Sequence, residues 1–372
     1  MSGAGPPGGA LTVLHIDTER GWRGGERQVF WLATEMLARG HRPIVAVRGG
    51  EPLANRLTMA GVETAEVEPL TEFDPFAAAR LRRVIRREEV AIVHAHTGHA
   101  VALAALAAMR TPARMVLTRR VDFPLRNNVG TRWKYGRAHG YIAISQIIAA
   151  MMMYRGISQS RIRIVPSGVD LSRRVEPAAA SVLESIGLPP GVPWVAQVGA
   201  LVRHKDPVNF VRAVAAARNS CPDLHGVLIG EGPLRQAVER AIGELQLGGA
   251  VHLTGHRADA DALLASASVA ALSSEMEGLG TVLLDAMAFG TPIAATRAGG
   301  IPEIVQHEVS GLLAAIHDPD ALGAAIARLA TDRALAARIT EGARRRVQDF
   351  SITRTMERTV DVYREVLMEN RG

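Results

Sequence analysis

Short apolar runs alternate with longer segments of helical spacing along the whole chain, and this alternation predicts a parallel α/β architecture. In the first half, runs typical of buried strands cover residues 11–16, 44–47, 90–94, 115–118 and 141–145. Helical spacing covers residues 28–39, which Gly40 closes, and residues 101–109. In the second half, strand-like runs cover residues 194–197, 226–229, 269–272 and 292–295, and helical spacing over 351–368 ends the chain.

The segment 273–292 carries the strongest functional signal. It follows a strand-like run and contains a glycine-rich turn that opens a helix, so its backbone N–H groups and positive dipole end are suited to phosphate. Glu277 lies in the turn and Asp285 in the helix, with seven residues between them. This spacing suits the two ends of one extended ligand, and a nucleotide sugar fits. An ordinary strand–helix unit with solvated acids is the alternative.

The second half contains four further glycine-rich segments: 198–206 and 230–234 before this segment, and 299–305 and 311–313 after it. In order and spacing, all five resemble the donor-binding half of family 4 of the glycosyltransferases, which has the GT-B fold. The resemblance extends from Leu11 to the C-terminal helix. It implies two Rossmann-like, doubly wound α/β domains facing a cleft. The chain departs from the family pattern at Asp285, where the family has a second Glu.

The resemblance also implies roles for residues of the second half. Glu277 would bind hydroxyls of the transferred sugar, and Asp285 would bind the ribose hydroxyls. Lys205 matches the phosphate-contacting lysine of the family, whereas Ala200 replaces its usual arginine, so Arg203 is the candidate substitute. Further donor contacts are expected from the backbone of Gly278, Leu279, Gly280 and Thr281 at the diphosphate and from Gly230 and Glu231 at the base.

Two segments of the first half complete the expected site. Gly24 and Gly25 resemble the glycine-rich loop that approaches donor phosphate and acceptor closely. Glu26 begins the next helix, where the dipole favours a carboxylate, and is an acceptor-side candidate.

His94 and His96 end a strand-like run, and alternation along a strand predicts that one faces the sheet and the other the cleft. We expect His96 in the cleft, where it would polarise the reacting sugar as a catalytic residue beside Glu277 and Lys205. A capping or core histidine is the alternative. Arg119 and Arg120 end the next strand-like run and are candidates to bind an anionic acceptor or the diphosphate.

The domain organisation follows from these segments. Residues 1–10 are expected to form a disordered tail, 11–170 an N-terminal acceptor-side domain, and 171–350 the donor-binding domain. Residues 177–193 are linker-like. The last helix, 351–372, is expected to cross back to the first domain and pack there through Phe350, Met356, Val360, Tyr363 and Val366.

Charge is divided unevenly between the halves. Residues 1–170 carry 23 basic and 14 acidic residues, a net charge of +9, while the whole chain carries +6. A basic half fits an anionic membrane surface or an acidic acceptor, with a solvated basic face as the alternative. Nucleic acid is disfavoured because aromatic residues, 4% of the chain, do not interleave with the arginines. The single Cys221 and the lack of a signal peptide favour a cytoplasmic protein. The basic face favours a peripheral position on the inner face of the membrane and a glycan or lipid-linked acceptor.

Metal and cofactor are not expected. Asp259 and Asp261 form an Asp-x-Asp triplet, but they begin a helix and are interpreted as N-terminal caps. Lys205 and helix N-termini would then neutralise the diphosphate. The resemblance implies retention of anomeric configuration. No carboxylate pair is placed as a covalent nucleophile, so a same-face mechanism is expected, and the basic face favours a role in cell-envelope glycan or lipopolysaccharide assembly. A GT-B epimerase or phosphorylase and a non-enzymatic basic peripheral protein are the alternatives. A Rossmann dehydrogenase is disfavoured because no Gly-x-Gly-x-x-Gly follows the first strand.

Overall fold

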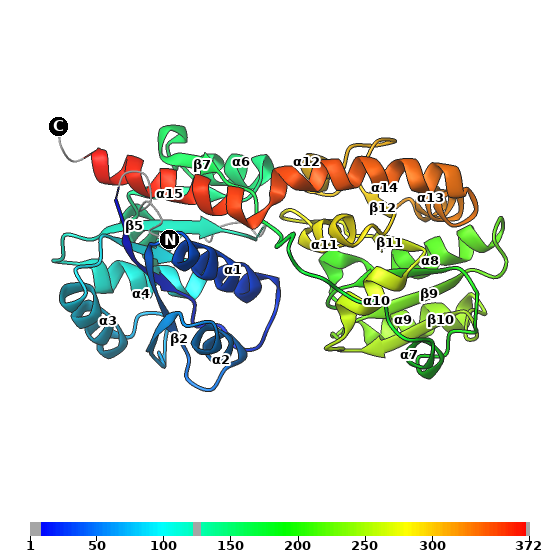
Figure 1. Cartoon of the computed structure of the whole chain (residues 1–372), viewed down its shortest axis with the longest axis horizontal. Helices are drawn as coiled ribbons and strands as arrows, with labels where there is room; N and C mark the ends of the chain where they lie inside the picture. The colour runs from blue at the N-terminus through cyan, green and yellow to red at the C-terminus, as the bar shows by residue number, and fades with distance from the viewer. Residues whose placement is uncertain (1–8, 122–127, 370–372) are drawn as a thin grey trace, which may run out of the picture. The chain divides into compact units, whose positions relative to one another are not determined.

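The structure is a computed structural model that describes residues 9–121 and 128–369. It divides into two compact units (Figure 1). Unit 1 comprises Met1–Asp170 together with Ile352–Gly372, and unit 2 comprises Leu171–Ser351. Most of the expected disordered tail, residues 1–8, lies outside the described residues.

The centre of unit 1 is a sheet of seven parallel strands within the described residues, in the order β3-β2-β1-β4-β5-β6-β7. The chain order reverses between β1 and β4, which pair directly. The strands are β1 Thr12–Ile16, β2 Arg42–Val47, β3 Glu63–Glu66, β4 Ile92–Ala95, β5 Arg114–Arg119, β6 Gly140–Ala143 and β7 Ile162–Ile164.

Helices cover this sheet as its βα units require. They are α1 Gly24–Ala38, α2 Pro52–Met59, α3 Pro75–Arg87, α4 Gly98–Ala108, α5 Val129–Gly136, α6 Gln146–Tyr154 and α15 Ile352–Met368, with a 3₁₀ turn at Gln159–Arg161.

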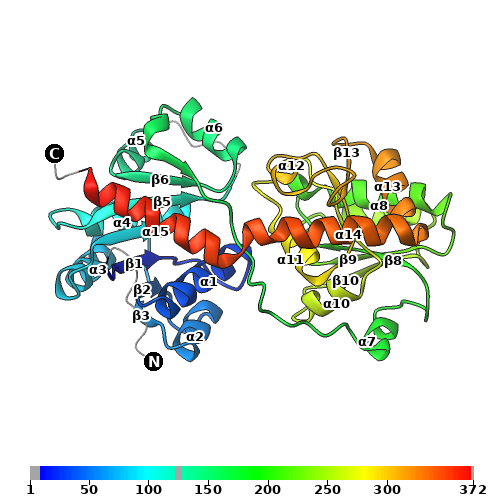
Figure 2. The ribbon, with the colours of Figure 1, turned by 45° about the horizontal axis from the view of Figure 1, so that its top comes forward.

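The C-terminal helix α15 is part of unit 1, although it follows unit 2 in the sequence (Figure 2). Met356, Val360 and Tyr363 share one face and are buried with strand residues such as Val116 and Ile142. The helical spacing of these side chains explains this packing. Phe350, expected on the same face, instead ends a 3₁₀ turn of unit 2, where the Arg346 guanidinium carbon lies 4.9 Å from its ring centroid.

Unit 2 repeats the design with six parallel strands in the described residues, in the order β10-β9-β8-β11-β12-β13. Its chain order reverses between β8 and β11. The strands are β8 Trp194–Val198, β9 His225–Ile229, β10 Val251–Gly255, β11 Val269–Leu272, β12 Ile293–Thr296 and β13 Leu312–Ala314. The helices are α7 Ala180–Ser185, α8 Pro207–Arg218, α9 Arg235–Glu244, α10 Ala260–Ser266, α11 Thr281–Phe289, α12 Ile301–Ile304, α13 Pro319–Thr331 and α14 Arg333–Val347, with 3₁₀ turns at Arg203–Lys205 and Gln348–Phe350.

Two sequence predictions of local structure were wrong. The helix expected from residue 28 begins at Gly24, because the Glu26 carboxylate accepts the Arg23 backbone N–H (2.7 Å) and stabilises an earlier first turn. The segment expected to be a linker, 177–193, contains α7, whose Leu188 flank is buried.

No helix among the described residues combines the length and the apolar character needed to cross a bilayer.

Candidate functional site

The candidate donor site lies in unit 2, at the carboxyl ends of β8 and β11. In doubly wound sheets, ligands bind where the strand order reverses, and these two strands flank that point. Hydrogen bonds join the loops that follow them: Glu275 N–H donates to the His204 carbonyl (3.0 Å), and the Ser273 hydroxyl donates to the Lys205 carbonyl (3.0 Å). The predicted loops therefore form one surface.

Lys205 and Glu277, predicted from separate motifs, come together on this surface. The Lys205 ammonium donates to Glu277 Oε2, which also accepts the Ser274 hydroxyl at 3.3 Å. The side chains keep exposures of 20% and 13%, so both groups remain accessible to a ligand. A cation and an anion in contact present complementary partners for a diphosphate and for sugar hydroxyls.

Close backbone packing supports the Glu277 loop. Gly299 has a positive φ of 49°, and a Cβ there would lie 1.9 Å from the Glu277 carbonyl oxygen. Gly300 N–H donates to the same oxygen at 2.8 Å. The glycine pair 299–300 thus allows the loop before α12 to hold the loop before α11.

The start of α11 supplies donors beside this pair. Gly280, with φ 84°, is the residue before the helix and has no side chain to cap the first turn. Leu279 is buried and fixes the turn, while Thr281 begins the helix. Gly278 to Gly280 therefore lead into Thr281, the first residue of a nine-residue helix, whose first N–H groups have no partner four residues earlier in the helix.

Asp285 lies on α11 but is 2% exposed and paired. Its Oδ1 accepts from Arg173 Nη1 at 3.1 Å, and Arg173 also binds Asp261. Arg173 was not predicted from the sequence, because it belongs to no motif. The one signal was the shortened acid at position 285, which leaves room for a guanidinium.

The other donor candidates differ in position. Arg203 points into solvent, with its side chain 92% exposed and Nε 3.7 Å from Glu275. Gly230 follows β9, and a Cβ there would lie 2.0 Å from the Gly199 carbonyl oxygen, so it lets two strand-end loops approach. Glu231 is solvent-exposed and pairs with Arg235 at 2.5 Å.

The capping interpretation of the Asp-x-Asp triplet was wrong. Asp259 occupies the cap position of α10 without a side-chain bond to the helix backbone. Its carboxylate binds Arg257 instead (2.6 Å), and this bond lowers the pKa of Asp259. Asp261 binds Arg173. Each acid has an arginine partner within unit 2.

In unit 1 the corresponding reversal point lies between β1 and β4. Gly24 and Gly25 form the first turn of α1, and Glu26 is buried with its carboxylate on the Arg23 N–H. Glu26 therefore caps its own helix.

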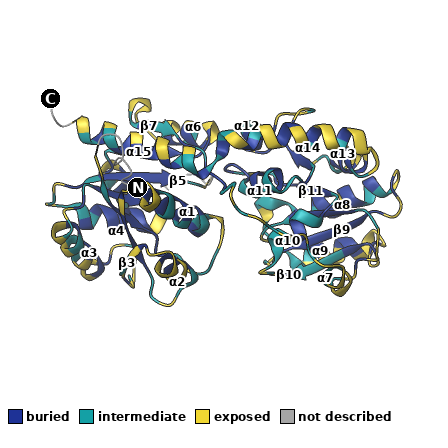
Figure 3. Cartoon of the chain, in the orientation of Figure 1, coloured by how far each residue is buried: buried dark blue, intermediate teal, exposed yellow. Residues whose placement is uncertain are grey.

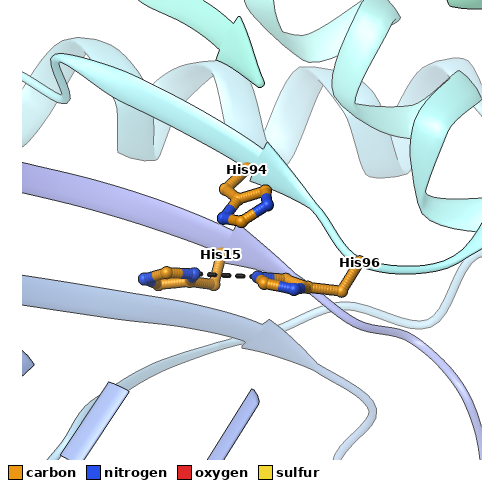
Figure 4. Close-up of side chains that lie close together, drawn as sticks. All are labelled: His15, His94 and His96. Carbon is orange, nitrogen blue, oxygen red and sulfur yellow. Dashed lines mark hydrogen bonds between the residues drawn. The ribbon is translucent and has the colours of Figure 1, made fainter. Parts of the chain in front are cut away.

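Three histidines meet at the carboxyl ends of these strands (Figure 4). His94 and His15 are fully buried, and His96 is 3% exposed. His94 contacts the Tyr363 hydroxyl (2.6 Å) and the Thr118 hydroxyl (2.7 Å), whereas His96 Nε2 lies 2.9 Å from His15 Nδ1. His94 thus faces the sheet and α15, as expected for one of the pair. His96, which we expected to face the cleft, is buried as well.

Arg120 determines the tautomers of this cluster. It donates to His96 Nδ1 at 3.2 Å, so His96 carries its proton on Nε2 and donates to His15 Nδ1. His15 then carries its proton on Nε2, which is buried without a partner among the described residues. Burial is the main cause that lowers the pKa of His15 to about 3 and those of His94 and His96 well below their usual value.

The three imidazoles are close enough to hold a metal ion, since one nitrogen of each lies within 4.8 Å of the others. Metal-bound histidines normally donate their second N–H to an acceptor. His96 instead accepts from a guanidinium, and Arg120 would repel a cation. The donor set fits a hydrogen-bonded chain better than a metal site.

Asp17, which the sequence reading missed, lies beside this chain. It directly follows β1, is 1% exposed, and binds Glu19 N–H through Oδ1 (3.2 Å), while Oδ2 is buried without a partner in the described residues. Burial and the nearby Glu26 raise the pKa of Asp17 to about 7. The polar spacing His15-x-Asp17 at a strand end was the available signal.

The two candidate arginines separate. Arg119, the last residue of β5, donates to the Tyr135 hydroxyl at 3.3 Å. Arg120 binds Ser167 (3.3 Å) as well as His96, and burial lowers its pKa to about 10. Arg120 thus joins the histidine cluster, whereas Arg119 contacts α5.

A pocket of about 490 Å³ opens at the same edge of the unit 1 sheet. Residues that follow β1, β2, β3 and β4 line it. They include Arg20, Arg23, Arg48 and His99, the acids Glu19 and Glu72, and the apolar Leu70 and Leu103. The sequence reading did not identify these arginines, because they are scattered over 30 residues and meet only in the fold.

Comparison with known proteins agrees with this geometry. Residues 22–173 match the profile of "Glycosyltransferase Family 4", and residues 180–346 match "Glycosyl transferases group 1". A D-inositol 3-phosphate glycosyltransferase of Salinispora tropica is 34% identical over 57% of this chain and 48% of its own length. The chain thus spans about half the length of this and similar curated relatives.

Longer similarities also exist. A D-inositol 3-phosphate glycosyltransferase of Nocardia farcinica is 29% identical over 100% of this chain and 87% of its own. The crystal structure of Anabaena HepE in complex with UDP and glucose superposes with a TM-score of 0.81, at 19% identity, over 95% of this chain and 100% of that one. The expected two-domain, Rossmann-like GT-B fold is confirmed.

Proposed function

Because the chain belongs to the family 4, group 1 glycosyltransferases, we propose that it transfers a sugar from a nucleoside-diphosphate sugar to an acceptor hydroxyl. The observation that carries the proposal is the contact between Lys205 and Glu277 where the strand order of unit 2 reverses. A UDP complex of a protein with the same fold supports a nucleotide at such a site.

Donor binding would exchange the partners of this ion pair. Lys205 would turn to the diphosphate, which the N–H groups at the start of α11 would also bind. Glu277 would then accept hydrogen bonds from hydroxyls of the sugar. Charge that develops on the departing phosphate is neutralised in this scheme by fixed groups, so we propose that no metal is required.

The proposed transfer proceeds with retention on one face of the sugar. The departing phosphate oxygen takes the proton of the acceptor hydroxyl as the new glycosidic bond forms and the bond to the diphosphate breaks. This route requires no carboxylate nucleophile.

Asp285 is proposed to bind the ribose. Arg173 would hold the short carboxylate in position for the ribose. The burial of the pair supports a fixed orientation.

The acceptor is proposed to bind at the carboxyl edge of the unit 1 sheet. Three arginines and two glutamates line the pocket, and this excess of cations supports an acceptor with an anionic group, as do the relatives named for inositol 3-phosphate. We place the reaction on the cytoplasmic face of a membrane, in the assembly of cell-envelope glycans on a glycan or lipid-linked acceptor.

The proposal is tested with a panel of nucleoside-diphosphate sugars and measurement of diphosphate release. One donor should release its nucleotide faster with acceptor, and that nucleotide should raise the melting temperature, because ligands of the native state stabilise it. Epimerisation of the sugar without release, or dependence of release on inorganic phosphate, would favour an epimerase or a phosphorylase. No effect of any nucleotide would favour a non-enzymatic protein.

A further inference from the structure

An apolar patch stands out on the surface of unit 1. It consists of Leu70, Phe73, Phe76, Val129 and Trp133, and Figure 3 shows how much of α3 is exposed. Leu70 is 92% exposed, Phe76 82%, Val129 75% and Phe73 43%. Single exposed apolar residues are ordinary, but a group of large ones marks an interaction surface.

Contacts across two elements hold the patch together. The ring centroids of Phe73 and Trp133 lie 6.1 Å apart, which joins the loop before α3 to α5. Lys134 binds Glu72 and the Gly98 carbonyl, so a buried lysine fixes the same junction. These contacts join the loop before α3 to α5 at the patch.

A buried acid orients the most exposed members. Asp74 is 7% exposed and accepts the backbone N–H groups of Leu70 (3.0 Å), Phe76 (2.9 Å) and Ala77 (3.0 Å). The carboxylate thereby caps α3 and closes the turn from which Leu70 and Phe76 project. This hydrogen-bonded turn keeps the side chains of Leu70 and Phe76 exposed to solvent.

Cations border the patch. Phe76, Arg80 and Arg83 lie four and seven residues apart on α3, so they share one face, and both arginines are exposed. On α5, exposed Arg132 follows Val129 by three residues. Arg137 lies over the Trp133 ring, with its guanidinium carbon 5.4 Å from the centroid.

Few acids lie near these cations. Glu63 and Glu66 of β3 line the same hollow as Arg80 and Arg83, and Glu63 is paired with Arg42. Between residues 70 and 87 the only acids are Glu72 and Asp74. Glu72 is paired with Lys134, and Asp74 is turned toward the backbone. Protruding apolar side chains with an arginine border are complementary to a bilayer that carries anionic headgroups.

We propose that this patch seats unit 1 on an anionic phospholipid membrane. Leu70, Phe73, Phe76 and Val129 would enter the headgroup region, while Arg80, Arg83 and Arg132 contact phosphates. Leu70 also lines the arginine-rich pocket, so the pocket would open beside the bilayer. The proposal rests on the proposed function only for that last point, since membrane docking does not require sugar transfer.

The test is cosedimentation of the full chain with vesicles of phosphatidylcholine, either alone or mixed with about 30% phosphatidylglycerol. The mixed vesicles carry the anionic headgroups that attract basic segments. The wild type should bind the anionic vesicles and leave the neutral ones. Leu70→Ser with Phe76→Ser should weaken binding by at least about tenfold, which corresponds to about 1.4 kcal/mol. Arg80→Gln with Arg83→Gln should weaken it and reduce its dependence on salt.

Met59→Ser is the matched control. Met59 is 88% exposed on α2 of the same unit but lies outside the patch, so its replacement should leave vesicle binding unchanged. All variants should keep the far-UV circular dichroism and the melting temperature of the wild type, because only surface side chains change.

Three results would overturn the proposal. The first is a wild type that ignores anionic vesicles, and the second is a Leu70/Phe76 variant that binds them as the wild type does. The third is concentration-dependent self-association that the variant loses while no vesicle is bound, which would make the patch an interface between copies. A negative vesicle test would not contradict the proposed sugar transfer, and a failure to detect sugar transfer would not contradict vesicle binding. The two proposals can therefore be refuted independently.

Discussion

Glu277 is the residue on which the donor-site chemistry depends most. Its loop is held by Gly299 and Gly300, and its carboxylate contacts Lys205 without entering a hydrophobic core. Glu277→Ala should therefore lower transfer by about 100-fold or more, as loss of one group that acts in the transition state does. The melting temperature should change little.

The matched control is Glu239→Ala, which removes an exposed carboxylate of the same unit that binds Arg235. Steady-state rates of diphosphate release compare the two variants. A Glu277 variant within a few-fold of the wild type would remove Glu277 from the site.

Asp285 allows a test of ribose contact. Asp285→Asn keeps the shape and removes the charge, so it should weaken nucleotide binding by roughly 1–3 kcal/mol. The 2′-deoxy nucleotide should lose less affinity in this variant than in the wild type, because the two changes delete the same contact. Calorimetric titration gives both values.

Asp261→Asn is the control for this coupling, since it removes the charge of another acid that binds Arg173. The 2′-deoxy penalty should persist in that variant. Additive losses with Asp285→Asn would mean that Asp285 holds Arg173 and does not touch the ribose.

At the scale of elements, packing between loops decides whether the site forms. A Cβ at Gly299 would lie 1.9 Å from the Glu277 carbonyl oxygen, in a backbone with φ 49°. Gly299→Ala should push the Glu277 loop away from α12, lower stability by at least about 1 kcal/mol and abolish the nucleotide-induced thermal shift. Gly249→Ala, where a Cβ meets nothing within 4 Å, should behave as the wild type. Normal nucleotide binding by the Gly299 variant would contradict this account of the loop.

The sequence predicted secondary structure correctly where the hydrophobic pattern was clear. The strand 269–272 was predicted with its observed bounds, and the helix after it begins at Thr281 as the motif required. Short strands such as β3 (Glu63–Glu66) and β7 (Ile162–Ile164) were missed. Four residues of mixed polarity carry too little periodic signal, and pairing with a neighbouring strand decides their conformation.

The candidate site was predictable only in part, for a similar reason. Lys205 and Glu277 lie in motifs that follow adjacent strands, so topology alone brings them together. Arg173 and Arg120 bind acids or histidines far away in sequence, and such partners appear only when the chain is folded. The burial of His96 was unpredictable for the same reason, because it depends on contacts with residues distant in sequence.

For the molecule as a whole, metal independence distinguishes the proposed chemistry. Diphosphate release should survive incubation with EDTA, because Lys205 and the N-terminus of α11 are proposed to neutralise the diphosphate. The assay compares rates with EDTA, with Mg²⁺ and with Mn²⁺. A strict metal requirement would redirect attention to Asp259 and Asp261, despite their arginine partners.

Stability of unit 1 should depend on pH through its buried histidines. Burial depresses the pKa of His15 to about 3, and those of His94 and His96 fall as well, so the folded unit excludes protons that the unfolded chain binds below about pH 6.5. Their contribution to stability is therefore present above pH 6.5 and is lost as the pH falls. Each such histidine costs about 1.4 kcal/mol per pH unit in that range.

Asp17 acts in the opposite direction. Its folded pKa of about 7 exceeds its unfolded value, so its contribution is complete below about pH 4 and is lost as the pH rises toward 7. Between pH 4 and 6.5 three histidines oppose one carboxyl, and unit 1 should lose stability on acidification. His15→Asn should make that loss shallower by about 1.4 kcal/mol per pH unit, and Asp17→Asn should make it steeper by a similar amount.

Urea unfolding in a Trp194→Phe background measures this, because the remaining tryptophans, Trp22, Trp31 and Trp133, all belong to unit 1. His99→Asn, which replaces an exposed histidine of the same unit, is the control and should leave the slope unchanged. Equal slopes for wild type, His15→Asn and Asp17→Asn would show that these groups bind protons in the folded unit as they do in the unfolded chain. In that case the chain from Arg120 through His96 to His15 would be hydrated, and His96 would be open to a ligand after all.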